Sequence, residues 1–245
     1  MPAKWIGVHI PTGKGLPSAL HAASAMGCTA AQVFTSSPRL WKSKPISDEM
    51  ASAFKAAWQE TGLGPVISHD TYLVNLCAPS DEIRAKSIVA LGEELERCAT
   101  YGIDRAVSHI GAHMGAGEEE GQRIAAESLR EVLERSPESV TVLAETTAGQ
   151  GSCLHHRLDS LARFLDLFPA RVHACLDTCH LFAAGYDLRT EESFAATMDE
   201  IGRTLTWERV GAIHVNDSKK PLGSRVDRHD HLGQGEIGEL GVLPR

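Results

Sequence analysis

The stretch "RVHACLDTCH", residues 171–180, joins a short apolar run to two side chains of kinds that bind metals. Residues 171–177 are apolar on both faces, which is typical of a strand buried in a parallel sheet. Asp177 closes this run, and His180 follows three residues later, on the turn that leaves the strand. The pattern predicts a buried strand that carries a carboxylate and an imidazole at its carboxyl end.

Six further runs of this kind lie elsewhere in the chain. They are "WIGVHI" (5–10), "AQVFT" (31–35), "PVISH" (65–69), "RAVSHI" (105–110), "SVTVLAE" (139–145) and "VGAIHV" (210–215). Helical patterns separate them, so that strand and helix alternate with a period of roughly 30–40 residues. This order predicts an α/β fold, a TIM-type (β/α)8 barrel without its final unit, as a single domain over residues 1–245. An open doubly wound sheet is the alternative, but no GxGxxG motif follows the first strand.

Capping residues mark two of the predicted helices. Ser47 precedes a helix that ends before Gly62, and Ser80 precedes another. The expected apolar face of the first helix consists of Met50, Phe54, Ala57 and Trp58, and that of the second of Ile88, Leu91, Leu95 and Cys98. A third helix is expected over residues 118–135, because this segment begins with acidic residues and ends with basic ones.

The composition excludes several classes of protein. The net charge of −8 argues against a broad basic surface for nucleic acid, although a local basic cleft or bound metals could still meet DNA. No apolar run is long enough to span a membrane, and the first residues do not resemble a secretion signal. The six cysteines are scattered without a CxxC pair, which predicts reduced thiols and a cytoplasmic location. No protein partner is evident.

Polar residues of metal-binding types close five consecutive predicted strands. These residues are His69, His109, Glu145, Asp177 and His214. In a barrel, the carboxyl ends of all strands meet at one face, where active sites lie. His180, and Asp227 and His229 in the late loop "GSRVDRHDHLGQGEIG" (223–238), can reach the same face. Imidazole and carboxylate donors suit Zn²⁺, with Mn²⁺ as a possible substitute, and eight of them imply more than one ion, bridged by Glu145.

These segments resemble the endonuclease IV family of bacterial apurinic/apyrimidinic endonucleases. The likeness covers essentially the whole chain, and its most specific segments are "SHDTYLVNL" (68–76), "AETTAGQGS" (144–152), "CLDTCHLFAAGYDLRT" (175–190), "HVNDSK" (214–219) and the late loop. The resemblance implies three zinc ions. The expected groups are His69, His109 and Glu145, then Glu145, Asp177 and His214, and finally His180, Asp227 and His229.

The resemblance also implies a substrate and its products. The substrate is double-stranded DNA with an abasic site, cut on the 5′ side to leave a 3′-hydroxyl and a 5′-deoxyribose phosphate. Arg39, Tyr72 and Leu73 are expected to wedge into the duplex. A basic cluster near the late loop could meet phosphates, and it consists of Lys219, Lys220, Arg225 and Arg228.

The chain also departs from the family pattern. Pro11 and Lys14 stand where the family prefers small residues. The family continues through another helix and an eighth strand, which adds a zinc-binding glutamate to the second ion, whereas this sequence ends with "GELGVLPR". A C-terminally truncated chain is therefore expected to hold the second zinc weakly and to have reduced activity. Two alternatives stay open: a xylose isomerase-like sugar isomerase or epimerase, and a truncated relative that binds but turns over poorly.

Overall fold

The computed structural model describes residues 5–239. Its chain divides into two compact units, and the division passes through α3 (Asp81–Tyr101), α4 (Glu118–Arg135) and β5 (Thr141–Glu145). The first unit consists of Met1–Val74, Ala85–Ser108 and Arg130–Val142, and the second of Asn75–Arg84, His109–Leu129 and Leu143–Arg245. The prediction of one domain over the whole chain stays a prediction.

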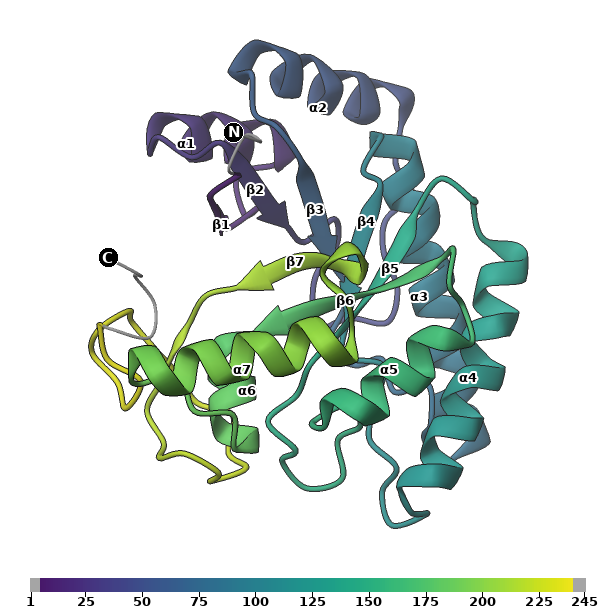
Figure 1. Ribbon diagram of the computed structural model, residues 1–245. Helices are drawn as coiled ribbons and strands as arrows, with labels where there is room; N and C mark the ends of the chain where they lie inside the picture. Colours follow the sequence, from purple (N-terminus) through teal and green to yellow (C-terminus); the bar gives the residue numbers. More distant parts are fainter. Residues whose placement is uncertain (1–4, 240–245) are drawn as a thin grey trace. The chain divides into compact units, whose positions relative to one another are not determined.

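The seven predicted strands are all present in one sheet (Figure 1). They are β1 (Gly7–His9), β2 (Ala30–Val33), β3 (Val66–His69), β4 (Arg105–Ser108), β5 (Thr141–Glu145), β6 (Val172–Asp177) and β7 (Val210–His214). Neighbours follow the order of the sequence, from β1 to β7. A doubly wound sheet would instead place later strands on both sides of the first, so this alternative is excluded.

Strand pairing is parallel in both units. In the first unit, Val8 pairs with Ala31, Gln32 with Ile67, and Ser68 with Ala106. In the second unit, β6 pairs with β7 so that Asp177 lies opposite His214. Parallel pairing brings the carboxyl ends of adjacent strands to the same edge, which is the edge that carries the predicted ligands.

Helices connect these strands. They are α1 (Leu16–Ala25), α2 (Asp48–Thr61), α3 (Asp81–Tyr101), α4 (Glu118–Arg135), α5 (Leu158–Asp166), α6 (Thr178–Ala184) and α7 (Glu191–Thr204), with a 3-10 turn at η1 (Trp207–Arg209). None of the helices within residues 5–239 combines the length and the apolar character needed to cross a membrane. All six cysteines are free thiols, as predicted.

Helix α2 begins and ends where the sequence predicts. The Ser47 side chain accepts the Met50 N–H at 3.2 Å, and Gly62 ends the helix in the left-handed conformation, with φ at 63°. The predicted apolar face is wrong at Met50, which is 48% exposed. The buried face instead runs through Ala51, Phe54 and Ala57, because residues three apart share one side of a helix.

A buried carboxyl group in the first unit fastens α3 to β3 and to the loop after β2. Glu94 accepts hydrogen bonds from Ser68 and from Thr35 Oγ1, the latter at 2.7 Å. Burial raises the pKa of this carboxyl group, against the effect of the Ser68 and Thr35 hydroxyls. Ser68 directly precedes His69 in β3, so the network fixes the backbone beneath a predicted ligand.

The late loop folds back on α6 in the second unit (Figure 1, yellow). The N–H groups of Gly223 and Arg225 donate to the carbonyls of Phe182 and Ala183, at 3.1 and 2.9 Å. A short antiparallel pair joins β8 (Asp217–Ser218) to β9 (His229–Asp230). These contacts hold the loop beside the carboxyl ends of β6 and β7.

Candidate metal centre

Seven of the eight predicted ligands belong to the second unit. Glu145, Asp177 and His214 are the last residues of β5, β6 and β7, and His109 directly follows β4. His180 lies in the first turn of α6, and Asp227 and His229 come from the late loop. Four successive strand ends therefore contribute side chains, as the alternation of apolar runs and polar residues predicts.

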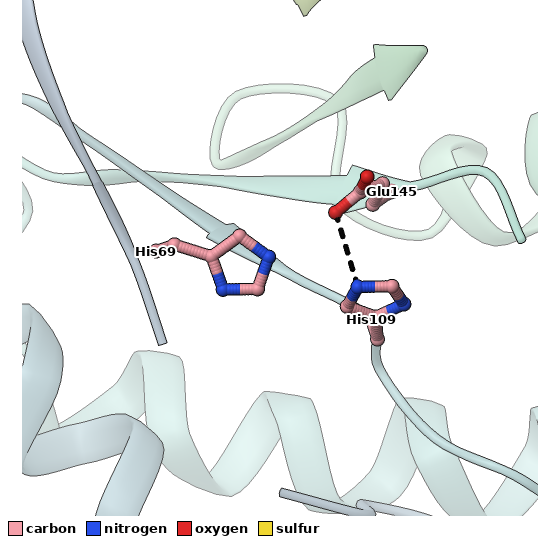
Figure 2. Close-up of side chains that lie close together, drawn as sticks. All are labelled: His69, His109 and Glu145. Carbon is pink, nitrogen blue, oxygen red and sulfur yellow. Dashed lines mark ion pairs between the residues drawn. The ribbon is translucent and has the colours of Figure 1, made fainter. Parts of the chain in front are cut away.

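Glu145 lies at the centre of this group. Its Oε2 is 3.3 Å from Nε2 of His109, and its Oε1 is 2.9 Å from Nδ1 of His214. The carboxylate is only 2% exposed. Figure 2 shows the pair between His109 and Glu145 and also draws His69. The two oxygens of one buried carboxylate thus face different imidazoles, which is the arrangement a bridging ligand requires.

Asp177 is held rigidly on three sides. Its Oδ2 accepts from Asn216 Nδ2 at 2.6 Å, and its Oδ1 accepts the His180 N–H at 3.0 Å, which caps α6. Its own N–H donates to Thr146 Oγ1 at 2.9 Å. The Nδ1 atom of His214 is 3.9 Å from Oδ2. Because its side chain is fully buried and oriented, Asp177 presents its carboxylate toward His214 without further rearrangement.

His180 faces the late loop with one particular nitrogen. Its Nδ1 lies 2.7 Å from the Thr146 carbonyl oxygen, so this nitrogen carries a proton and donates it. Its Nε2 lies 3.3 Å from both Asp227 Oδ2 and His229 Nε2, and His229 Nε2 is 3.3 Å from Asp227 Oδ1. Two nitrogens each about 2.0–2.1 Å from a tetrahedral zinc would be roughly 3.3–3.4 Å apart. The donor atoms therefore already have the spacing that such an ion demands.

The electrostatics of the group also favour a cation. Burial alone would lower the pKa of His180, but the carboxylates of Asp177, Asp227 and Glu145 outweigh burial and raise it to about 10. Burial would likewise raise the pKa of Asp227, but His180 lowers it. A proton on a buried imidazole here offsets an excess of negative charge, and a divalent ion can take the same place.

Two cysteines lie within reach of the same carboxylates. The Cys175 thiol is near Glu145 and His214, and the Cys179 thiol is near Asp177 and His229. Burial, with Glu145 and Asp177, raises the pKa of Cys175 well above its ordinary value. Burial, with Asp177, raises that of Cys179 to about 12. Since a thiolate is the form that binds metals, both groups are poor ligands beside these carboxylates.

His69, the eighth predicted ligand, ends β3 in the first unit. Its Nδ1 lies 2.9 Å from the Asp70 carbonyl oxygen and 3.6 Å from Asp70 Oδ1. Asp70 Oδ2 in turn accepts from Ser108 Oγ at 2.6 Å. A carboxylate behind an imidazole orients the ring and increases its basicity, as behind many metal-bound histidines. Its place among the ligands of the second unit stays a prediction.

The predicted DNA wedge also belongs to the first unit. Tyr72 is 62% exposed, Arg39 is exposed and Leu73 is half-buried. The Pro38 carbonyl oxygen accepts from the Tyr72 N–H at 3.2 Å and from Thr71 Oγ1 at 2.8 Å. These bonds join the loops after β2 and β3, so the three side chains come from one connected surface.

Sequence reasoning missed the residues that orient the ligands. Asp70, Thr146 and Asn216 each stand one or two positions after a predicted ligand, in "SHD", "AET" and "HVN". Their polar character at the ends of buried strands is the one signal that could have identified them. Their partners are set by packing between neighbouring strand ends, which no single segment encodes.

Comparison with known proteins identifies the family. The profile described as "Xylose isomerase-like TIM barrel" matches residues 20–242. A protein of Chloroflexus aggregans named "Probable endonuclease 4" is 48% identical over 235 residues, which is 95% of this chain and 82% of the relative. A protein of the same name from Trichlorobacter lovleyi is 43% identical over 237 residues, 96% of this chain and 84% of the relative.

Solved structures agree with these sequence relatives. Endonuclease IV from Thermus thermophilus is 36% identical and superposes with a TM-score of 0.85, over 96% of this chain and 83% of that one. A D-psicose 3-epimerase superposes with a TM-score of 0.62 at 14% identity, over 86% of this chain and 70% of that one, which shows a shared fold alone. The TIM-barrel fold class is thus confirmed. The chain belongs to the endonuclease IV family of hydrolases, within the xylose isomerase-like TIM barrel proteins.

Proposed function

We propose that this protein is a zinc-dependent endonuclease that hydrolyses the phosphodiester bond 5′ to an abasic site in double-stranded DNA. The products are a 3′-hydroxyl and a 5′-deoxyribose phosphate, as in base-excision repair. The observation that carries the proposal is the buried Glu145 carboxylate, which faces imidazoles on both of its oxygens. The names and the high identity of the relatives support the same activity.

The proposal assigns the donors to three zinc ions. His69, His109 and Glu145 would hold the first ion, and Glu145, Asp177 and His214 the second. His180, Asp227 and His229 would hold the third, where the donor atoms have tetrahedral spacing. Imidazoles outnumber carboxylates, which favours zinc over magnesium, and Mn²⁺ can substitute in such a set. When bound, these ions lower the pKa of water and neutralise charge on the phosphate.

The residues of the chain supply orientation. Glu145 joins two groups of ligands, and Asn216 and Thr146 hold Asp177 in place. The Thr146 carbonyl fixes the His180 ring so that Nε2 faces Asp227. Hydrogen bonds of this kind behind the ligands keep them close to their bound positions and so reduce the reorganisation that binding requires.

Selection of the abasic site would rest on Arg39, Tyr72 and Leu73. An abasic nucleotide lacks base stacking, so flipping it from the duplex costs less than flipping an intact one. Exposed apolar and cationic side chains that enter the stack stabilise the bent, open duplex. A cytoplasmic location stays a prediction. The likeness between this chain and the D-psicose 3-epimerase extends to the fold alone, so it does not favour a sugar isomerase.

The test is cleavage of a duplex with one abasic site, with products identified by mass. Wild-type protein should cut on the 5′ side without added Mg²⁺, and prolonged chelation should remove the activity. Glu145→Gln should abolish cutting, because the carboxylate that joins the groups loses its charge. Glu134→Gln removes an exposed carboxylate and is the matched control. Cutting by Glu145→Gln at a rate near that of the wild type would refute the proposal.

A further inference from the structure

A cavity of about 280 Å³ opens beside the late loop in the second unit. It is bounded by the loops that follow β4, β5 and β7. Its polar side chains are His113, Glu118, Ser152, His156, Arg157 and Arg225. None of these is a predicted metal ligand, so the cavity is separate from the groups described above.

Arg225 is the cation of this cavity that is available for a ligand. Its backbone N–H is fixed to the Ala183 carbonyl oxygen, and its φ of 53° turns the chain at this point. Among residues 5–239, no carboxylate forms an ion pair with its guanidinium group. The second arginine, Arg157, is instead paired with Asp159 at 2.7 Å.

The other members of the predicted basic cluster differ from Arg225. Lys219 lies 3.9 Å from Asp230 Oδ1, and Arg228 donates to the Asp227 carbonyl oxygen at 2.6 Å. Neither lines the cavity within the part of the chain that the structure describes. Lys220 does not line it either, so Arg225 is the one member of the cluster, among the described residues, that lines the cavity.

Two histidines of the cavity wall are held in defined states. His113 Nδ1 accepts the N–H groups of Gly115 and Gly117, at 3.3 and 3.1 Å. The proton of its neutral ring is therefore on Nε2, which is left as a donor. Burial, and then the charge of Arg225, lowers the pKa of His156, and both residues line the cavity. Glu118 accepts from Ser160 Oγ at 2.5 Å.

The cavity adjoins the metal-ligand groups through two short links. Asp227, a predicted ligand, is two residues after Arg225 in the chain. Its N–H donates at 3.1 Å to Oε1 of Gln150, which lies in the loop that forms another wall of the cavity. Hence a group bound in the cavity would be next to a group bound at Asp227 and His229.

From this geometry we infer that the cavity receives a second phosphate of the DNA backbone, adjacent to the one that is cleaved, with Arg225 as its main contact and His113 as a donor. A backbone phosphodiester carries one negative charge, and it suits a cavity that offers a guanidinium without a carboxylate partner and an imidazole N–H. This inference rests on the proposed function, because it assumes a DNA strand that passes the ligand groups.

The experiment measures single-turnover cutting of an abasic duplex at several salt concentrations. The half-saturating protein concentration of Arg225→Gln should rise on the order of tenfold, and the slope of its logarithm against log salt should fall by about 0.9, the value for one phosphate contact. Arg225→Lys should keep the slope of the wild type. Arg203→Gln, which removes an exposed charge from α7, should leave both quantities unchanged.

A set of duplexes locates the phosphate. Each carries one neutral methylphosphonate in place of a phosphate other than the scissile one. At one position, the methylphosphonate should raise the half-saturating concentration of the wild type and leave that of Arg225→Gln unchanged. Both changes would then remove the same contact. The inference is overturned if Arg225→Gln has the same half-saturating concentration and salt slope as Arg203→Gln, and if each methylphosphonate weakens Arg225→Gln as much as it weakens the wild type. In that case, cutting of the abasic duplex by the wild type still upholds the proposed function. A wild type that cuts no abasic duplex overturns both.

Discussion

Asp217 accepts the backbone N–H of Gly235 at 2.9 Å, although the two residues are 18 positions apart. The same carboxylate accepts N–H groups from Ser218, Ile237 and Gly238 as well. Any side chain at Gly235 would collide with Asp217 and with the Ser218 carbonyl. Asp217 thus fastens the end of the late loop to β8, which pairs with the strand that contains His229.

Asp217→Asn should loosen the late loop. Burial would raise the pKa of Asp217, but the four N–H donors lower it, so the native state requires the carboxylate. An amide replaces one acceptor with a donor, and we expect a loss of about 2–4 kcal/mol in the free energy of unfolding. Zinc at the His180 group should be released more easily, and protease should cut within residues 223–238.

Asp230→Asn is the control for this change. Asp230 lies opposite Asp217 in the β8–β9 pair and is an acidic residue of the same hairpin. Equal release of zinc by the two variants would show that charge on the hairpin matters and that the hydrogen bonds of Asp217 do not.

His229→Ala should remove about one zinc ion per chain from the protein. The Nε2 atoms of His180 and His229 and the Asp227 carboxylate form a triangle of donors, and a tetrahedral site does not hold an ion tightly after losing one of its protein ligands. Native mass spectrometry would give the number of ions. His231→Ala removes an exposed histidine two positions later in the same loop. If His231→Ala lost zinc and His229→Ala did not, the assignment of the third group would be wrong.

Most of the fold could be predicted because buried parallel strands have a plain sequence pattern. All seven apolar runs became strands, and five of them have a predicted ligand at or just after the last residue. The end of β6 is the best case, since Asp177 both closes the strand and caps α6. The pattern is local, so it can be recognised without knowledge of tertiary contacts.

Other features depend on contacts between distant segments. Strands β8 and β9 have two residues each and no apolar run, so the sequence gives no sign of them. The orientation of His180 depends on a carbonyl 34 positions earlier, at Thr146. Helical spacing predicts Met50 on the buried face of α2, but packing buries Ala51 in its place.

Arg39→Ala should weaken binding to abasic duplex by about 1–3 kcal/mol, with a smaller effect on intact duplex. The side chain is exposed on the loop that the Pro38 carbonyl joins to Tyr72. Fluorescence anisotropy with the two duplexes would measure the difference. Lys55→Ala removes another exposed cation and should reduce binding to both duplexes equally, if at all. An unchanged preference for abasic DNA in Arg39→Ala would exclude a wedge role for this residue.

His155 should make the protein sensitive to acid independently of its metals. The side chain is fully buried, its ring lies 4.7 Å from Phe164, and neither ring nitrogen has a hydrogen-bond partner within residues 5–239. Burial, and then His156, lowers the pKa of His155 to about 3. The folded state therefore keeps the ring neutral, whereas the unfolded chain takes up a proton as the pH falls below about 6.5.

The sign of the effect follows from that difference. The contribution of the neutral ring to the free energy of unfolding is fully present above about pH 6.5 and is lost as the pH falls toward 3. At pH 4.5 the loss amounts to roughly 2–3 kcal/mol. His155→Leu should lack this part of the acid dependence, even if the leucine alters stability equally at all pH values. Urea unfolding of metal-free protein at pH 7.5 and 4.5 would measure it, with His21→Leu, at an exposed histidine, as control. An acid dependence of His155→Leu as steep as that of the wild type would mean that other groups cause it.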